Sequence, residues 1–92
     1  MKLIIFTDGG ARGNPGPAAA GIVIKNDKGA VVEAFGKYLG ETTNNQAEYR
    51  ALLLALSIWN LSVKFKKISY HHIRREKNTE ADKLVNETLD RQ

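Results

Sequence analysis

The stretch IIFTDGGARGNPGPAAAGI, residues 4–22, joins an apolar run to an aspartate and then to a bend rich in glycine and proline. The stretch 2–7, apolar without a break from Leu3 to Phe6, is typical of a strand that other elements cover on both faces. We therefore expect a buried strand that carries Asp8 at its end. Two interpretations of this carboxylate stay open: it forms an Asx-type turn into Gly9 and Gly10, or it binds a metal ion.

Downstream of the bend, the pattern predicts a hairpin and then a helix. Residues 18–25 and 30–39 are predicted strands, because the intervening NDKG offers a tight turn in which Gly29 tolerates a positive φ. From 46 to about 60 the chain holds strong helix formers with apolar residues at helical spacing. The repeat consists of Leu52, Ala55, Leu56 and Trp59. Possible N-caps precede it, namely Thr42, Thr43, Asn44 and Asn45.

The last third of the chain predicts one more strand and one more helix. Residues 66–72 alternate weakly and indicate a strand, and Asn78 or Thr79 caps a final helix that continues through Leu89. The order β-β-β-α-β-α predicts an α/β fold in which helices pack on a mixed sheet. In this sheet the three N-terminal strands are antiparallel and the fourth is parallel. We expect one domain over residues 1–92.

Composition restricts the class of protein. The chain has no cysteine, no apolar stretch long enough for a bilayer and no signal-peptide pattern at its start, so we expect a cytoplasmic protein without membrane contact. The formal charge of +4 is compatible with nucleic-acid binding. Basic side chains gather in one region, at Lys64, Lys66, Lys67, Arg74, Arg75 and Lys77, with His71 and His72 among them. They form either a solvated edge strand or a phosphate-contacting strip.

Two further acids, Glu48 and Asp82, lie near the starts of the two predicted helices. Each has a simple interpretation, since a first-turn glutamate complements the helix dipole and Thr79–Asp82 can form a capping box. However, Asp82 shares a helix stripe with Val85 and Leu89, where a carboxylate needs compensation of its charge. One hypothesis covers all three acids: they converge, and a cation offsets their repulsion. Oxygen-only ligands suit Mg²⁺ or Mn²⁺, the ions with which many nucleases activate attack at phosphorus.

Three segments in this order resemble the type 1 ribonuclease H family, in the version of many archaeal and bacterial members. They are TDGGARGNPGPAAAGIVI, GETTNNQAEYRALLLAL and HIRREKNTEADKLVNETLD. The resemblance implies that Asp8, Glu48 and Asp82 hold divalent cations at the scissile phosphate of an RNA strand paired with DNA. It also implies a role for His72 in proton transfer or product release, with His71 as the adjacent rival. Residues implied to contact the RNA/DNA hybrid are Gly9, Gly10, Ala11, Asn14, Asn44, Asn45 and Gln46, with Arg74 and Arg75 near phosphates.

The chain departs from the family between residues 60 and 67. Family members carry there a strand whose aspartate is the fourth metal ligand, followed by a helical segment, and this chain has no aspartate between Glu41 and Asp82. The resemblance therefore implies one firmly bound Mg²⁺ or Mn²⁺ and a weakened second site. The absent strand leaves an exposed sheet edge. Either residues 66–72 move into the vacant place, parallel to the first strand, or two chains pair as a homodimer. We expect the homodimer, because residues 53–61 are strongly apolar.

The sequence thus supports two functional hypotheses. The first is a metal-dependent endonuclease that hydrolyses the RNA strand of RNA/DNA hybrids, impaired by the missing carboxylate. The second is an inactive, shortened module of the same fold that binds nucleic acid or has a structural role only. Metal binding that depends on Asp82 would separate the two.

Overall fold

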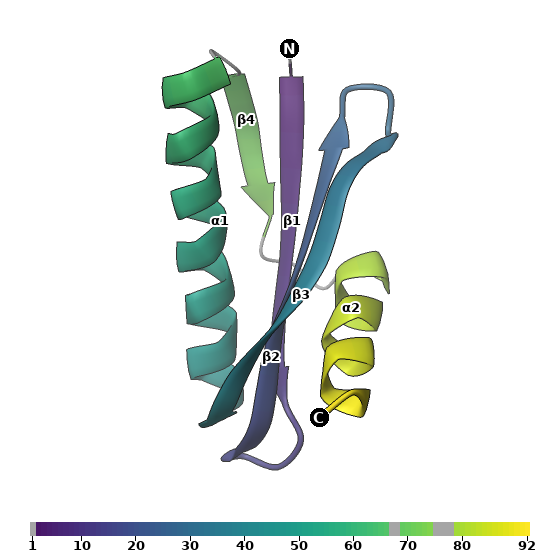
Figure 1. Ribbon diagram of the computed structural model, residues 1–92, viewed down its shortest axis with the longest axis vertical. Coiled ribbons are helices and arrows are strands. Elements are labelled where there is room, and N and C mark those ends of the chain that lie inside the picture. The colour runs from purple at the N-terminus through teal and green to yellow at the C-terminus, as the bar shows by residue number, and fades with distance from the viewer. Residues whose placement is uncertain (1, 67–68, 75–78) are drawn as a thin grey trace.

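The computed structural model describes residues 2–66, 69–74 and 79–92. Its elements are β1 (Lys2–Ala11), β2 (Gly16–Asn26), β3 (Val31–Thr42), α1 (Asn44–Lys66), β4 (Ser69–Arg74) and α2 (Thr79–Asp90). The four strands form one sheet in the order β3-β2-β1-β4, as Figure 1 shows. β2 pairs antiparallel with both β1 and β3, and β4 is parallel to β1. The predicted α/β mixed sheet and the β2–β3 hairpin are confirmed, and Gly29 has the positive φ that its turn needs.

The two helices lie on opposite faces of the sheet. Successive side chains of a strand point to opposite faces, so each helix packs against a different set of strand residues. Leu3 and Ile5 belong to a core cluster with Ala55 of α1. Ala19 of β2 instead belongs to a cluster with Val85 and Leu89 of α2. The long helix α1 therefore covers one face of β1, and the short helix α2 covers part of the other (Figure 1).

Helix α1 differs from its prediction in both length and buried stripe. It continues six residues beyond position 60, so Lys66 belongs to the helix and the fourth strand begins at Ser69. Over residues 44–60 of α1 the fully buried residues are Ala47, Ala51 and Ala55, whereas Leu52 and Leu56 of the predicted repeat are only half-buried. Alanines at a spacing of four bring the helix backbone close to the sheet, which bulky leucines prevent. Within the described residues, neither helix combines the length and hydropathy needed to cross a membrane.

The position of β4 shows the first of the two rearrangements, pairing within the chain, and does not bear on whether two chains also associate through another surface. Within this chain β4 pairs directly with β1 in parallel, with Ile4 opposite His72 and Phe6 opposite Arg74. The strand in residues 66–72 thus occupies the vacant place, although shifted to Ser69–Arg74. The described part of β4 ends level with Phe6, whereas β1 continues for five more residues. Past Phe6, no described strand pairs with this edge of β1.

Candidate active site

A pocket of about 380 Å³ lies at the end of β1 that extends past β4. Its walls come from β1, from the start of α1 and from α2, and they bring Asp8, Glu48 and Asp82 to one cavity. The remaining lining residues are Gly9, Gly10, Ala11, Arg12, Asn44, Val85, Asn86 and Leu89. Carboxylates separated by 40 and 34 positions in the sequence therefore face the same space.

Asp8 lies inside β1 and not at its end, which corrects the predicted strand boundary. β1 continues to Ala11, and Asp8 pairs with Gly21 of β2. The strand conformation excludes the Asx-type turn into Gly9 and Gly10. Asp8 is 9% exposed, so its carboxyl group occupies a largely buried position that needs a physical compensation.

Two glycines bring the helices close enough for the other acids to reach this cavity. A Cβ atom on Gly9 would collide with the backbone carbonyl of Ala47, the residue before Glu48. A Cβ atom on Gly21 would likewise collide with the carbonyl of Ala81, the residue before Asp82. Each acid therefore follows a point where a helix backbone touches a glycine of the sheet. Glu48 is the fifth residue of α1, so it lies in the second helical turn. The predicted position in the first turn is wrong.

Mutual repulsion and burial perturb the titration of Asp8. The pKa of Asp8 is raised from its ordinary value of 3.8 to about 6, chiefly by burial and also by the Asp82 charge, a hydrogen bond with Asp82 and the charge of Glu48. A hydrogen bond from the Gly9 backbone lowers the pKa and offsets part of the rise. The three acids are thus electrostatically coupled, and a positive charge among them would relieve the repulsion.

The acidic side chains of this pocket offer carboxylate oxygens, which are the ligands that hard divalent cations prefer. The side chains are nevertheless not arranged as a complete cage. Among the described residues, no group of three or more His, Cys, Asp or Glu side chains stands close enough together to hold a metal ion.

Hydrogen bonds tie the start of α1 to the β1–β2 turn. The Asn44 side chain accepts a hydrogen bond from the Ala11 backbone N–H at 2.7 Å, and the Asn44 backbone N–H donates to the Asn14 side chain at 3.0 Å. Thr43 is the N-cap of α1, since its hydroxyl oxygen accepts from the Gln46 N–H at 3.2 Å. These bonds hold the wall of the pocket that carries Glu48.

The other predicted contact residues differ in where they lie relative to the pocket. Gly9, Gly10, Ala11 and Asn44 line the pocket, whereas Asn14 instead supports Asn44. Asn45 and Gln46 are exposed in the first turn of α1, outside the lining. The predictions for the side chains of His71, His72 and Arg74 lie outside the described residues, although all three belong to β4. Arg75 lies entirely outside them.

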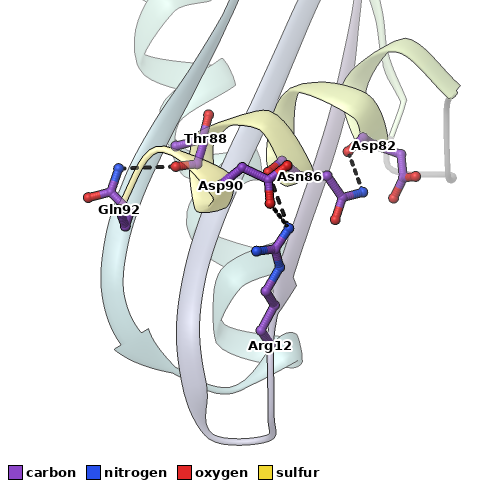
Figure 2. A network of polar contacts seen from close by, with 6 residues as sticks. All are labelled: Arg12, Asp82, Asn86, Thr88, Asp90 and Gln92. Carbon is purple, nitrogen blue, oxygen red and sulfur yellow. Dashed lines mark hydrogen bonds and ion pairs between the residues drawn. The ribbon is translucent and has the colours of Figure 1, made fainter.

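Sequence reasoning missed two polar residues of the pocket, Arg12 and Asn86. Figure 2 shows the Arg12 side chain extending from the β1–β2 turn to the C-terminal half of α2. There its Nη2 lies 2.6 Å from the Asp90 carboxylate and donates to the Asn86 carbonyl at 3.3 Å. Asn86 donates from its own side chain to the Asp82 carbonyl at 3.1 Å. Asn86 was detectable, because it follows Asp82 by one helical turn; nothing local in the sequence places Arg12 against α2.

A mixed sheet of this order, with helices on both faces and an acid-lined pocket beside its central strand, defines a protein of the ribonuclease H-like class. The family model described as RNase H matches residues 1–62, and a model described as reverse transcriptase-like matches residues 55–88. The chain therefore belongs to the ribonuclease H family.

Relatives in sequence agree with this assignment. A ribonuclease HI of Halobacterium salinarum is 53% identical over 55 residues, which cover 60% of this chain and 28% of that protein. A bifunctional protein of Mycobacterium tuberculosis is 30% identical over 131 aligned positions, covering 98% of this chain and 36% of that protein. The chain thus spans about a third of the length of these relatives.

Solved structures share the fold over nearly the whole chain. The RNase H1 of Halobacterium salinarum has a TM-score of 0.77 and 29% identity, with full coverage of both chains. The LC11-RNase H1, solved in complex with an RNA/DNA hybrid, has a TM-score of 0.73 and 38% identity, with 97% of both chains covered.

Proposed function

We propose that this chain is a metal-dependent endonuclease that hydrolyses the RNA strand of RNA/DNA hybrids. The observation that carries the proposal is the single pocket lined by Asp8, Glu48 and Asp82. Membership of the ribonuclease H family supports the reaction class, and the hybrid bound to LC11-RNase H1 supports the substrate class.

In this proposal Asp8, Glu48 and Asp82 hold Mg²⁺ or Mn²⁺. A bound divalent cation supplies Lewis acidity and a more acidic bound water, the usual contributions of metals to phosphodiester hydrolysis. The backbone around Gly9, Gly10 and Ala11 approaches the RNA strand without side chains in the way, where main-chain groups can read the 2′-hydroxyl. Asn44, Asn45 and Gln46 contact the hybrid from the start of α1, as does Asn14 beside them. His72 assists proton transfer or product release, while Arg74 and Arg75 contact phosphates from the end of β4 and beyond.

The reaction is slow in this proposal, because no fourth carboxylate lines the pocket among the residues that the structure describes. The alignment with the mycobacterial relative extends over 131 positions, although this chain has only 92 residues, which supports a deletion relative to that protein. Glu80 does not replace the lost ligand, since it forms an ion pair with Lys25 and does not line the pocket. One cation is therefore bound firmly, and a second is bound weakly.

Cleavage of an end-labelled hybrid in Mg²⁺ or Mn²⁺, with calorimetric Mn²⁺ titration beside it, tests this function. We expect wild-type cleavage and Mn²⁺ binding, and at least a hundredfold loss of cleavage (about 2.7 kcal/mol) in Asp82→Asn. Asp27→Asn is the matched control, because Asp27 is an exposed aspartate in the distant β2–β3 turn. Equal cleavage by both variants would disprove the proposal. Hybrid binding that EDTA leaves unaltered, without any cleavage, would instead establish the inactive binding module.

We further propose a single domain over residues 1–92, located in the cytoplasm and assembled as a homodimer. Exposed apolar side chains support the homodimer: Val31, Val32, Tyr38, Tyr49 and Leu53 are each between 39% and 54% exposed. Light scattering tests the assembly, and a monomeric mass at micromolar concentration would refute it.

A further inference from the structure

The β1–β2 turn places a positively charged side chain, Arg12, at the acid-lined pocket. Of the described residues that line this pocket, Arg12 alone carries a positive charge. Arg12 faces a cavity shared by three carboxylates. Because a guanidinium is positively charged and has no lone pair to offer, it cannot be a ligand of a metal cation. A guanidinium beside a site that handles phosphodiesters is suited to a phosphate group.

Toward the described part of the chain, the Arg12 side chain is anchored through one nitrogen only. Both of its contacts, to the Asp90 carboxylate and to the Asn86 carbonyl, use Nη2. A guanidinium has five N–H donors, and the contacts to these two acceptors leave the donors on Nε and Nη1 available for a ligand. The side chain is 48% exposed, so a ligand in the pocket can reach it.

The anchor itself is weak and replaceable. The Asp90 side chain is 64% exposed, and exposed ion pairs contribute little to stability. Asp90 also lies at the C-terminal end of α2, where the helix dipole disfavours a negative charge, and no basic residue occupies that last turn. In the free protein Arg12 neutralises this acid. A phosphate, which carries stronger acceptors, can compete with Asp90 for the same guanidinium.

On the basis of the function proposed above, we propose that Arg12 is a substrate-positioning residue that binds a backbone phosphate of the nucleic acid beside the three acids. Asp90 keeps the guanidinium at the rim of the pocket when nucleic acid is absent and competes with the phosphate when it is present. Arg12 thereby contributes to affinity and register, whereas the carboxylates hold the cation.

Fluorescence anisotropy with a labelled RNA/DNA hybrid in EDTA tests this role without any cleavage. At about 0.1 M salt we expect Arg12→Met to bind roughly tenfold more weakly than wild type, with a log–log salt slope shallower by about 0.9, the loss of one phosphate contact. Lys28→Met is the matched control. It removes the same charge from the exposed β2–β3 turn, at the other end of the sheet (Figure 1), and should retain the wild-type slope. Equal slopes for both variants would overturn the proposal.

Asp90→Asn provides a second measurement with the opposite sign. Release of Arg12 should strengthen hybrid binding about threefold relative to the charge-matched Asp27→Asn. Equal or weaker binding would overturn the proposal, and this comparison decides alone if Arg12→Met does not fold. A purely structural ion pair would lower the unfolding temperature in both Arg12→Met and Asp90→Asn without either change in affinity.

Wild-type cleavage, measured separately, keeps the two proposals apart. Cleavage together with an unchanged Arg12→Met slope would reject the phosphate contact and leave the nuclease proposal standing. No cleavage together with an Arg12-dependent slope would reject the nuclease and retain the contact.

Discussion

Replacement of Asp8 by asparagine should stabilise the protein against unfolding at neutral pH when no divalent cation is present. Asn keeps the size of Asp and removes the charge that burial and the neighbouring acids disfavour. The pKa of Asp8 rises from 3.8 to about 6 in the folded chain. Because a tenfold change in proton affinity corresponds to about 1.4 kcal/mol, the ionised form destabilises the folded state by about 3 kcal/mol. Because Asp8 lines a solvent-accessible pocket, screening reduces this value, and we expect about 2 to 3 kcal/mol.

The sign of the pH dependence follows from proton linkage. Between pH 3.8 and about 6 the folded state binds more protons at Asp8 than the unfolded state does, so this group lowers stability as the pH rises. Below this window both states are protonated and the wild type and Asp8→Asn should differ little. Above it the full difference of about 2 to 3 kcal/mol in favour of Asp8→Asn should be present.

Urea unfolding in EDTA at several pH values from about 4 to 8 measures this difference. Asp27→Asn serves as the control for the loss of one acidic residue, because it is exposed in the β2–β3 turn. Equal stability of Asp8→Asn and wild type at pH 8, or a difference that does not change with pH, would refute the reasoning. If the acids bind a cation, Mn²⁺ at about a hundred times its Kd should stabilise the wild type by about 2.7 kcal/mol and reduce the advantage of Asp8→Asn.

Two further substitutions test how the pocket is built. Gly21→Ala should destabilise the fold by about 1 to 3 kcal/mol and reduce cleavage, because its Cβ collides with the rigid backbone carbonyl of Ala81. The control is Gly10→Ala, whose Cβ finds only ordinary contacts and which should retain the wild-type unfolding free energy. Similar losses in both variants would contradict this explanation. Thr43→Ala should lower the free energy of unfolding by about 1 kcal/mol in urea, since the Gln46 N–H loses its acceptor. Thr43→Ser keeps the hydroxyl and should unfold like wild type. An unchanged free energy of unfolding in Thr43→Ala would show that the cap is dispensable.

Local chemistry in the sequence was sufficient for most elements. The NDKG turn defined the β2–β3 hairpin, because its residues favour the required backbone angles wherever they occur. The same kind of local preference restricted the cap of α1 to Thr42–Asn45 and the start of α2 to the neighbourhood of Asn78 and Thr79, and the structure has Thr43 and Thr79. The predicted end of α1 was six residues too early. No proline or glycine stops the helix near residue 60, so packing decides how far it continues.

Sequence alone also selected Asp8, Glu48 and Asp82 as the acids of interest, because their motifs resemble a known family and their positions need compensation. It did not decide that they share a cavity. That juxtaposition depends on two close approaches, of Gly9 to Ala47 and of Gly21 to Ala81, which join residues far apart in the chain.

Tertiary structure alone decided where the fourth strand pairs and that Arg12 reaches α2. Strand pairing is a choice among edges that have similar backbone hydrogen-bonding capacity, so the sequence left both the internal and the intermolecular partner open. Arg12 contacts a residue 78 positions away, and a long flexible side chain carries no local signal of its partner. Contacts of this kind exist only once the sheet and both helices have formed.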